Sequence, residues 1–430
     1  MTDKQTARIE NSISSMKIAF FVTQFPSLSQ SFVLNQITGL MDLGHNVDIF
    51  AKAPGDNSKF HDDVMKYGLL ERTTYFRDIY KSLPPDQPAR TLKGLKYVYE
   101  YGYKHPIPII RSLNVFKYRR QATSFRLLTQ VVSLLERSSY DVIQCHFGPM
   151  GIMAATLREI GALRGKLVTV FHGFDLTTHL KKTGRHVYGS LFQMGDLFLP
   201  ISQRWKELLI DMGCPPEKVV VHKMGIDTRK FGFVPRSKEN DGKIVALTVA
   251  RLVEKKGVEY AVKAFAKTLG TYPNMEYLIA GDGPLKAHIS SLVKNMGIES
   301  KVKLLGWKNQ EEILDLMNKA HIFLCPSVTA KEGDQEGIPV AIMEAMATGM
   351  PVLTSNHSGI PELVQHGLSG FIVPERDVDA LSDKLSYLVN HPEIWSEMGS
   401  VGTRFVEENH EIRKLNHNLT DLFQDLLLQN

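Results

Sequence analysis

The chain has 430 residues, of which 43% are hydrophobic and 23% charged, with a formal net charge of +5. At about 100–200 residues per domain, this length predicts a globular protein of two or three domains. No stretch approaches the ~18 consecutive apolar residues of a membrane-spanning helix, and the polar start, MTDKQTARIENSISS, lacks the apolar centre of a secretion signal. These features argue against an integral membrane protein and predict a cytoplasmic one.

The cysteines indicate the cellular compartment, and the distribution of charge indicates possible binding partners. Cys145, Cys214 and Cys325 are odd in number, far apart and in no CxxC pair, which fits a reducing compartment and argues against a zinc cluster. Lys and Arg outnumber Asp and Glu by 11 over residues 1–230, mostly between residues 51 and 200. Over residues 231–430 the formal net charge is −6. A basic half suggests contact with phosphates, nucleic acid or an anionic membrane. A solvated basic face without a partner is the alternative.

The first half of the chain alternates strand-like and helix-like segments. Residues 16–22, MKIAFFV, form an apolar run of strand length, and a helical pattern then ends on Gly44. Further strands are expected at 46–50, 141–145, 167–171 and 197–201, with a helix at 205–212 before Gly213. This order predicts a parallel sheet covered by helices. Residues 1–15 are expected to form a flexible tail ahead of this domain, which spans residues 16–225.

Residues 57–140 fit this alternation poorly. They contain KSLPPDQP and then a region rich in Tyr, Lys and Arg, TLKGLKYVYEYGYKHPIPIIRSLNVFKYRRQATSFRLL. This composition predicts an inserted group of helices whose basic and aromatic residues are suited to a membrane surface. A purely structural helical pair is the alternative.

After the polar stretch at 234–243 the alternation restarts. Strands are expected at 243–249, 276–281, 301–305, 321–325, 351–355 and 370–374, separated by helix-length segments. A second doubly wound α/β domain is therefore predicted for residues 226–405. In residues 406–430, Leu415, Leu419 and Phe423 share one helical face, which predicts a C-terminal helix that packs back toward the first domain.

Open parallel sheets bind ligands at the carboxyl ends of their strands, so the turns after the strands are candidate sites. Arg251 leaves the strand at 243–249, and Lys256 lies just before the next helix. Two cations beside a helix N-terminus form an anion site suited to a diphosphate. Surface pairing of these cations with Glu254 and Glu259 is the alternative. The turn GDGP, residues 281–284, also lets a ligand approach the backbone, although glycine turns end many strands.

The segment EGIPVAIMEAMATGMPV, residues 336–352, places seven residues between two carboxylates. Pro339 is expected as the first helical residue and Gly349 as the end of the helix. Glu344 then lies in the second turn of a helix that is apolar nearly all round, where an unpaired carboxylate is costly. Glu336 and Glu344 would be an acid and base pair if they flanked one bond, as in a glycosidase. Alternatively, Glu344 accepts hydrogen bonds from a ribose diol.

The sequence FHGFD places His172, Gly173 and Asp175 directly after the strand at 167–171. A lone histidine is more often structural than catalytic, but this position favours a role in the site. His146 ends the preceding strand, so a two-histidine metal site is conceivable. The spacing suggests no third ligand, and no metal site is predicted.

In this order, the segments resemble the retaining glycosyltransferases of the GT-B fold in the family 4 group. The resemblance spans about residues 16–405 and is carried by GHNVDIF, TVFHGFD, ARLVEKKG, IAGDGP, LLGWKNQEEILDLMNKAHIFLCPS, EGIPVAIME and HSGIPELVQHGLSGFIV. Each motif alone is weak, but the ordered series is specific. The variants FPSLSQSFV and SVTAKEGDQEGIPVAIMEAM most resemble bacterial exopolysaccharide enzymes of the colanic acid and amylovoran type.

The resemblance implies two Rossmann-like domains that face each other across a cleft, with the nucleotide sugar mainly on the second and the acceptor mainly on the first. By this resemblance, Arg251 and Lys256 hold the donor diphosphate, and Glu344 binds the ribose. Glu336, with the backbone of Gly337 and Ile338, faces the donor sugar. The resemblance also implies that Gly283 lies in a donor-side turn, Trp307 borders the base, and His172 lies by the reaction centre. His172, Arg251, Lys256 and Glu336 are thus the expected catalytic residues. No cofactor or metal ion is expected, because the basic pair and a helix N-terminus replace it.

Two departures from the wider family pattern leave donor contacts open. In place of a Gly-Gly pair in the first loop stands FPSLSQSF, with Ser27, Ser29 and Ser31. Pro339 replaces a common glycine in the segment with the two carboxylates, which removes one N–H donor.

The sequence therefore predicts transfer of a hexose from a nucleoside diphosphate sugar to a lipid-linked oligosaccharide in exopolysaccharide assembly. Retention of configuration follows from the resemblance alone. Peripheral contact with the cytoplasmic face of an anionic inner membrane is expected, and a nucleic-acid partner is not. A nucleotide-sugar epimerase on a similar fold and a non-catalytic nucleotide-sugar sensor are the alternatives. A nicotinamide dehydrogenase is disfavoured, since no G-x-G-x-x-G follows either domain's first strand.

Overall fold

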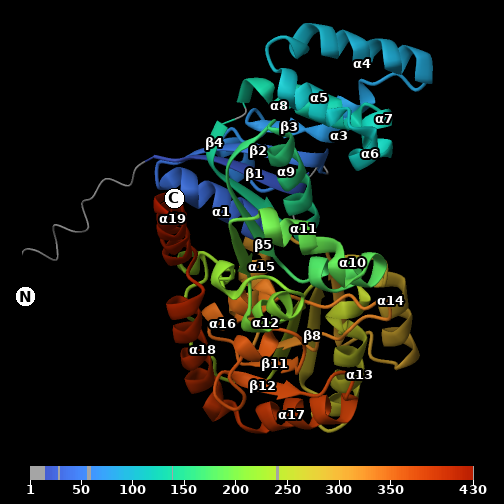
Figure 1. The fold of residues 1–430 in the computed structure, drawn as a ribbon. Coiled ribbons are helices and arrows are strands. Elements are labelled where there is room, and N and C mark those ends of the chain that lie inside the picture. Colours follow the sequence, from blue (N-terminus) through green and yellow to red (C-terminus); the bar gives the residue numbers. More distant parts are fainter. Residues whose placement is uncertain (1–14, 28–29, 56–59, 138, 239–241, 430) are drawn as a thin grey trace, which may run out of the picture.

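The computed structural model describes residues 15–27, 30–55, 60–137, 139–238 and 242–429. The flexible tail predicted for residues 1–15 lies outside these ranges except for Ser15, as does Ser29 of the first loop. The described residues form two lobes, one above the other in Figure 1, each built on a six-stranded parallel sheet. The predicted arrangement of two Rossmann-like domains is confirmed.

The first sheet has the order β3-β2-β1-β4-β5-β6 and the second β12-β11-β10-β7-β8-β9. The strands are β1 Lys17–Phe25, β2 Asn46–Pro54, β3 Thr73–Tyr75, β4 Ser139–His146, β5 Arg164–Phe171, β6 Leu197–Pro200, β7 Ile244–Val249, β8 Met275–Ala280, β9 Val302–Gly306, β10 Ile322–Cys325, β11 Val352–Ser355 and β12 Gly370–Val373. In each sheet the chain starts near the middle, builds outward to one edge and then returns to build the other half. The order therefore reverses between β1 and β4, and again between β7 and β10, and ligands of such sheets bind at these points.

The strands were predictable because both faces of each sheet are covered by helices, which makes the strands nearly continuous apolar runs. Residues 18–22 of β1, for example, are all fully buried. The strand β3 was not predicted. Its three residues, TTY, are only half-buried and carry no apolar run.

The helices are α1 Ser31–Asp42, α2 Asp63–Lys66, α3 Phe76–Lys81, α4 Gln87–Gly102, α5 Pro106–Ser112, α6 Val115–Tyr118, α7 Arg120–Thr123, α8 Arg126–Leu134, α9 Gly148–Ile160, α10 Thr178–Thr183, α11 Gly189–Met194, α12 Gln203–Asp211, α13 Val258–Leu269, α14 Lys286–Asn295, α15 Gln310–Lys319, α16 Val340–Ala347, α17 Val378–Asn390, α18 Trp395–Asn409 and α19 Ile412–Leu428. Helix α1 ends as predicted, with Gly44 in the left-handed conformation at φ +87°.

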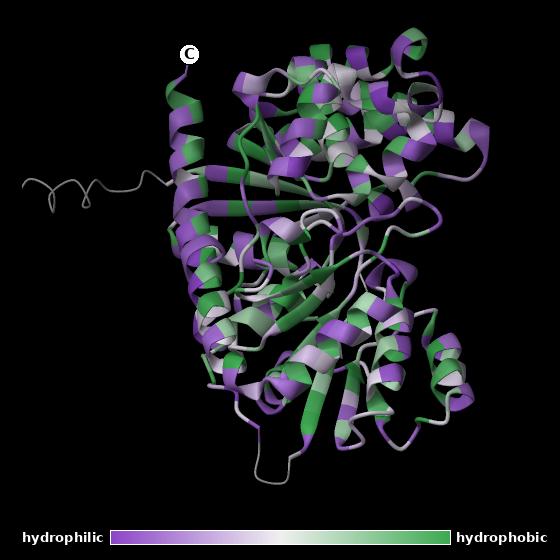
Figure 2. Cartoon of the chain, turned by 90° about the horizontal axis from the view of Figure 1, so that it is seen from below, coloured by the Kyte–Doolittle hydropathy of each residue, from purple (hydrophilic) through white to green (hydrophobic). Residues whose placement is uncertain are grey.

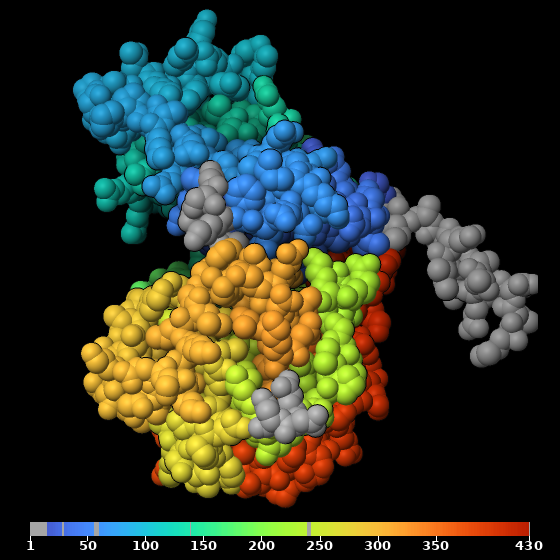
Figure 3. Space-filling model, turned by 180° about the vertical axis from the view of Figure 1, so that it is seen from behind, coloured from blue at the N-terminus to red at the C-terminus, as the bar shows by residue number. Residues whose placement is uncertain are grey.

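The helices between β2 and β4 form a group that projects from the first lobe, coloured from light blue to teal in Figures 1 and 3. Helix α8 buries an apolar face in the core of the first domain, whereas α4 has only Gly94 buried. The inner face of α4 packs Tyr97, Val98 and Tyr101 against the first domain's core, whereas Leu92, Leu95 and Tyr99 are exposed to solvent.

The chain crosses between the lobes twice, and the two crossings pair with each other. The Ile226 amide donates to the His410 carbonyl and the Ile412 amide donates to the Ile226 carbonyl, both at 2.9 Å. After the second crossing, α19 lies along α1 of the first domain (Figure 1). Its residues alternate between hydrophobic and hydrophilic in Figure 2.

Helix α19 completes the first domain's core with side chains from the end of the chain. Leu419 and Phe423 are fully buried in this core, and Leu426 is nearly so. His45 and Thr420 form a buried hydrogen bond of 3.1 Å. The first domain is thus built from both ends of the sequence.

Two further features of the described residues concern membrane spans and cysteines. Among the described residues, no helix is long and apolar enough to cross a membrane. Cys145, Cys214 and Cys325 are buried free thiols.

Candidate active site

The strongest cluster of charged side chains lies at the carboxyl ends of β7 and β10, where the second sheet reverses its strand order. The Lys256 Nζ lies 2.8 Å from Glu336 Oε2, and the Lys255 Nζ lies 3.3 Å from Glu336 Oε1. Lys255 also contacts Asp334 Oδ2 at 3.1 Å. Lys255 and Lys256 precede α13, and Glu336 is in the loop before α16. Residues about 80 positions apart therefore meet because their strands are neighbours.

Burial and mutual attraction set the charges of this cluster. Burial alone would raise the pKa of Glu336, but Lys256 and Lys255 reverse the effect and lower the pKa to about 2. Burial likewise works against the charge of Lys256, and Glu336 outweighs it, so the pKa of Lys256 is raised. Glu336 and Lys256 are therefore both charged at neutral pH. The alternative in which Arg251 and Lys256 pair with Glu254 and Glu259 on the surface is wrong. Lys256 pairs with Glu336, Glu254 accepts from the Lys331 amide, and Glu259 binds Lys263 and His288.

Arg251 lies close enough to Lys256 to oppose its protonation. Its side chain is exposed and has no ion pair with any part of the chain that the structure describes. The cluster therefore leaves one cation open to an anionic ligand. The predicted Gly283 lies in the neighbouring turn with φ +157°, and a Cβ there would lie 2.6 Å from the Leu252 carbonyl oxygen. Glycine thus lets this turn pack against the backbone that follows Arg251.

The loop around Glu336 also contacts the first domain. A Cβ on Gly337 would overlap the carbonyl oxygen of His172, so only glycine allows this approach. Ile338 is buried. Neither the Gly337 amide nor the Ile338 amide has a hydrogen-bond acceptor within the described residues. Two N–H groups are thus available beside Glu336.

Helix α16 begins one residue later than predicted. Pro339 has extended backbone at the position before the helix, and Val340 is the first helical residue. The reason is that Pro339 keeps ψ at 117°, outside the helical region. Gly349 follows the helix in the left-handed conformation, at φ +80°, as predicted.

Glu344 lies in the second turn of α16, as predicted, and is half-buried rather than fully enclosed. Its carboxylate has no hydrogen bond or ion pair with the described residues. Burial raises the pKa of Glu344 to about 7. A half-buried carboxylate without a partner is suited to accept hydrogen bonds from a ligand.

Replacing Glu344 with glutamine is expected to weaken donor binding about 10–100-fold, since a hydrogen bond to a charged group contributes about 1.5–3 kcal/mol. In the wild type, the KM for the donor should rise as the pH falls through about 7, because a protonated Glu344 accepts less well. The glutamine variant should lose this dependence. Initial rates between pH 6 and 8.5 measure both effects.

A measurement of stability without ligand checks whether the charge of Glu344 stabilises or destabilises the fold. Because folding raises the pKa of Glu344, its carboxylate disfavours the fold at high pH, where it must ionise. Glu344→Gln should therefore melt at a higher temperature than the wild type at pH 8. A variant with wild-type KM, pH dependence and melting temperature would contradict this account.

His172 lies across from this loop in a buried polar network of the first domain. His172 Nε2 is 3.0 Å from His146 Nδ1, and the rings are stacked with centroids 5.2 Å apart. His146 in turn contacts Gln144 at 3.3 Å. Burial lowers the pKa of both histidines, that of His146 to about 3. Both rings are therefore neutral at physiological pH.

Asp175 fixes the backbone beneath His172. Its carboxylate accepts from the amides of His172, Gly173 and Gly148 at 2.9–3.1 Å. His172 Nδ1 is buried without a hydrogen-bond partner among the described residues. No group of three or more His, Cys, Asp or Glu residues suited to a metal ion occurs in the described part of the chain.

Of the remaining predicted residues, Trp307 follows β9 and is 45% exposed.

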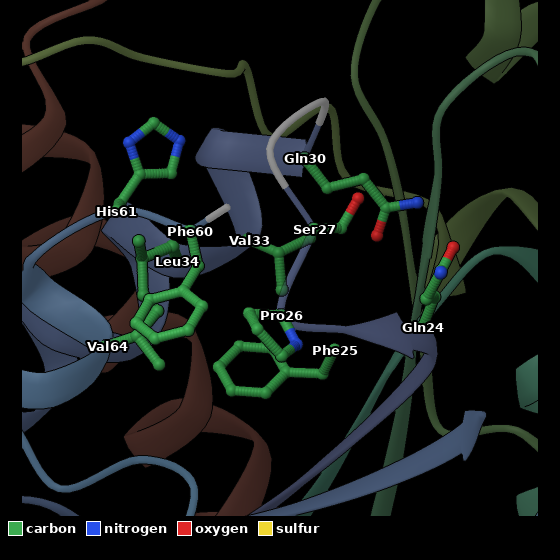
Figure 4. A pocket seen from close by; sticks show the side chains of 10 residues that line it. All are labelled: Gln24, Phe25, Pro26, Ser27, Gln30, Val33, Leu34, Phe60, His61 and Val64. Carbon is green, nitrogen blue, oxygen red and sulfur yellow. The ribbon is translucent and has the colours of Figure 1, made fainter. Parts of the chain in front are cut away.

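A cavity opens at the carboxyl end of β1, behind the loop that holds Ser27. Figure 4 shows its apolar wall of Phe25, Pro26, Val33, Leu34, Phe60 and Val64 beside the polar Gln24, Gln30 and His61. The cavity belongs to the domain that does not hold the charged cluster.

Sequence reasoning missed three participants. Lys255 shares Glu336 with Lys256. His357 and Glu375 lie behind Glu336, at the ends of β11 and β12. Their signal is the position of HSGIPELV and VPERD directly after strands, the same criterion that selected Arg251 and His172.

Comparison with known proteins assigns the class. Residues 29–230 match the family described as "Glycosyltransferase Family 4", and residues 233–404 match "Glycosyl transferases group 1". The chain belongs to the GT-B glycosyltransferases. A structure of Anabaena Alr3699/HepE in complex with UDP-glucose has a TM-score of 0.70 and 19% identity, covers 95% of this chain and all of that one, and shows the same fold.

Particular relatives can be compared over most of their length. The Salmonella typhimurium protein named "Putative colanic acid biosynthesis glycosyltransferase WcaL" is 37% identical over 419 residues, which are 96% of this chain and 100% of that protein. The Erwinia amylovora "Amylovoran biosynthesis glycosyltransferase AmsK" is 41% identical over 85% of this chain and 89% of its own. The Escherichia coli "UDP-Gal:alpha-D-GlcNAc-diphosphoundecaprenol alpha-1,3-galactosyltransferase" is 26% identical over 60% and 68%.

Proposed function

We propose that this glycosyltransferase moves a hexose from a nucleoside diphosphate sugar to a lipid-linked oligosaccharide in exopolysaccharide biosynthesis, with retention of configuration. The observation that carries the proposal is the cluster of Lys255, Lys256 and Glu336 beside Arg251, at the point where the second sheet reverses. The near full-length similarity to proteins named for colanic acid and amylovoran biosynthesis supports the biological setting.

In this proposal the second domain binds the donor. Arg251 and Lys256 hold the diphosphate and stabilise the charge that develops on it as the bond to the sugar breaks. Glu344 accepts from the ribose hydroxyls, and Trp307 borders the base. Glu336 and the amides of Gly337 and Ile338 contact the sugar. The chain's own cations carry the electrostatic role, so no metal ion is proposed.

The first domain would bind the acceptor beside His172. A hollow lined by His172 itself places the polar side chains of Gln36, His222 and Lys223 beside the apolar Phe32 and Ile412. A relative named for transfer to a saccharide on diphosphoundecaprenol supports a lipid-linked acceptor. Retention is supported by the resemblance to retaining enzymes. Glu336, already paired with two lysines, is not placed as a free nucleophile.

The test is a panel of UDP and GDP sugars, first for thermal stabilisation and then for transfer to lipid-linked saccharides. A donor at 100 times its Kd should stabilise the fold by about 2.7 kcal/mol. Transfer should release nucleoside diphosphate and lengthen the acceptor, and NMR of the product gives its anomeric configuration. Conversion of the donor without an acceptor would indicate an epimerase, and binding without turnover a sensor. Either result overturns the proposal.

We also propose that the projecting helices contact an anionic membrane. Leu92, Leu95 and Tyr99 on one face of α4, and Tyr103 directly after it, are 59–86% exposed. Phe116 on α6 is 95% exposed. Between residues 87 and 126, nine Lys or Arg residues accompany one acidic residue, Glu100. Exposed aromatic and aliphatic side chains among cations are typical of surfaces that bind anionic lipid headgroups.

The wild-type protein should float with vesicles of phosphatidylglycerol and phosphatidylcholine, and less so at high salt. The triple variant Leu92→Ser, Tyr99→Ser, Phe116→Ser should stay in the aqueous fraction, because it loses apolar area without losing charge. Leu368→Ser, which changes a residue 60% exposed on the second domain, is the matched control. Wild-type protein that stays entirely in the aqueous fraction at low salt would refute membrane contact.

A further inference from the structure

The loop that carries Glu336 is fixed from behind by a buried histidine. The Glu336 amide donates to His357 Nε2 at 3.0 Å, and His357 Nδ1 donates to Glu375 Oε1 at 2.5 Å. The His357 side chain is fully buried. His357 follows β11 and Glu375 follows β12, so the two strands beyond β10 support the loop that leaves β10.

The chemistry of the two neighbours fixes the proton on His357. A backbone amide can only donate, so Nε2 must offer its lone pair. The Glu375 carboxylate can only accept, so Nδ1 must carry the hydrogen. His357 is therefore neutral with its proton on Nδ1. If Nε2 also carried a proton, its N–H would face the N–H of the Glu336 amide, and the hydrogen bond between them would be lost.

Glu375 is itself anchored on both sides. Its carboxylate accepts from the Thr329 amide at 2.8 Å, and Arg376 lies 3.3 Å away. Thr329 belongs to the same long loop as Glu336, and its hydroxyl accepts from Gln335 at 3.4 Å. Glu375 and His357 thus tie the start and the end of this loop to the ends of β11 and β12.

We propose that His357 and Glu375 are positioning residues for donor binding. They hold the Glu336 backbone so that its carboxylate, and the free amides of Gly337 and Ile338, face the donor sugar. This inference rests on the donor role proposed above for that loop. Neither residue contacts the donor, and both act through the amide of Glu336.

The arrangement predicts sensitivity to acid. Burial lowers the pKa of His357, while Glu375 and Glu336 act in the opposite direction and Arg204 of the first domain supports the lowering. Because the folded state prefers the neutral ring, its contribution to stability is complete above the ordinary histidine pKa and is lost as the pH falls through the lowered value. Acid should therefore weaken the hold of His357 on the Glu336 amide.

The test combines hydrogen–deuterium exchange over residues 333–340 with donor kinetics. His357→Ala should speed exchange of the Glu336 amide and raise the donor KM about 10–100-fold, with a smaller change in kcat, because small displacements of binding groups have effects of this size. His357→Gln should restore both, since its amide oxygen can accept from Glu336 and cannot be protonated in this range. It should also remove the further rise in KM below the ordinary histidine pKa, while the rise near pH 7 that Glu344 causes remains. Glu375→Ala should resemble His357→Ala, because the ring is then free to carry its proton on Nε2. In a His357→Gln background, Glu375→Ala should have a smaller effect than in the wild type, because only the contacts of Glu375 with Thr329 and Arg376 then remain to be lost.

His391→Gln is the matched control, since His391 pairs with Glu393 at 2.8 Å on the same domain but lies away from the loop. Folded His357→Ala protein with wild-type exchange and wild-type KM would overturn the inference, and so would a His357→Gln variant as impaired as the alanine variant. The exchange measurement needs no turnover. If it follows the prediction while no nucleotide sugar is used by the wild type, the proposed function fails and the positioning role stands.

Discussion

Lys256→Ala is expected to lower the rate of glycosyl transfer about 10²–10³-fold, the usual cost of removing one group that stabilises developing negative charge. Lys256 is the nearer of two lysines to Glu336, and its side chain is only 14% exposed. The substitution removes a cation from the proposed diphosphate site and leaves Glu336 to Lys255 alone. Initial rates with a saturating donor measure the effect.

The controls separate chemistry from folding. Lys263→Ala removes a half-buried lysine that pairs with Glu259 on α13, and it should keep the wild-type rate. Because Lys255 still partners Glu336, Lys256→Ala should remain folded, with a modest decrease in melting temperature. A folded Lys256→Ala protein that transfers sugar at the wild-type rate would remove Lys256 from the mechanism.

Phe423→Ala, near the end of the chain, is expected to destabilise the first domain by about 3–5 kcal/mol. Phe423 is fully buried in the core that β1 and α1 share with α19. For a domain of this size the change corresponds to a melting temperature lower by roughly 6–20 °C. Differential scanning calorimetry, with and without a nucleotide that binds the second domain, assigns the shifted transition to the first.

Leu428→Ala is the matched control for α19, because Leu428 is 81% exposed two residues before the end of the chain. It should leave both transitions in place. If Phe423→Ala also leaves the first domain's transition unchanged, α19 contributes little to that core.

Apolar runs and turns predicted most strands, because a strand buried on both faces must be apolar whatever its neighbours are. Arg251, Lys256 and Glu336 could be chosen as candidates for a similar reason, since each follows a strand. The pairing of Lys256 with Glu336 could not, because it depends on β10 lying next to β7. The order of strands in a sheet is not encoded in the spacing of any one segment.

For the same reason, the sequence did not reveal that His357 and Glu375 support the loop of Glu336. His357 and Glu375 lie 21 and 39 residues after Glu336, just beyond β11 and β12, so only the order β12-β11-β10 brings the three residues together. The burial of Glu344 was overestimated for a related reason. A helix that is apolar nearly all round was expected to be enclosed, but α16 leaves this carboxylate half-buried.

The place of α19 also has a consequence for how the protein is made. A ribosome that adds about 5–20 residues per second needs roughly 10–40 s to synthesise the second domain after the first has emerged. During that interval α1 lacks the side chains of Leu419 and Phe423 that later cover it. The second domain, whose strands are contiguous in the sequence, can finish folding while the first still waits for its last helix. The earliest part of the chain to be synthesised is thus the last to be completed.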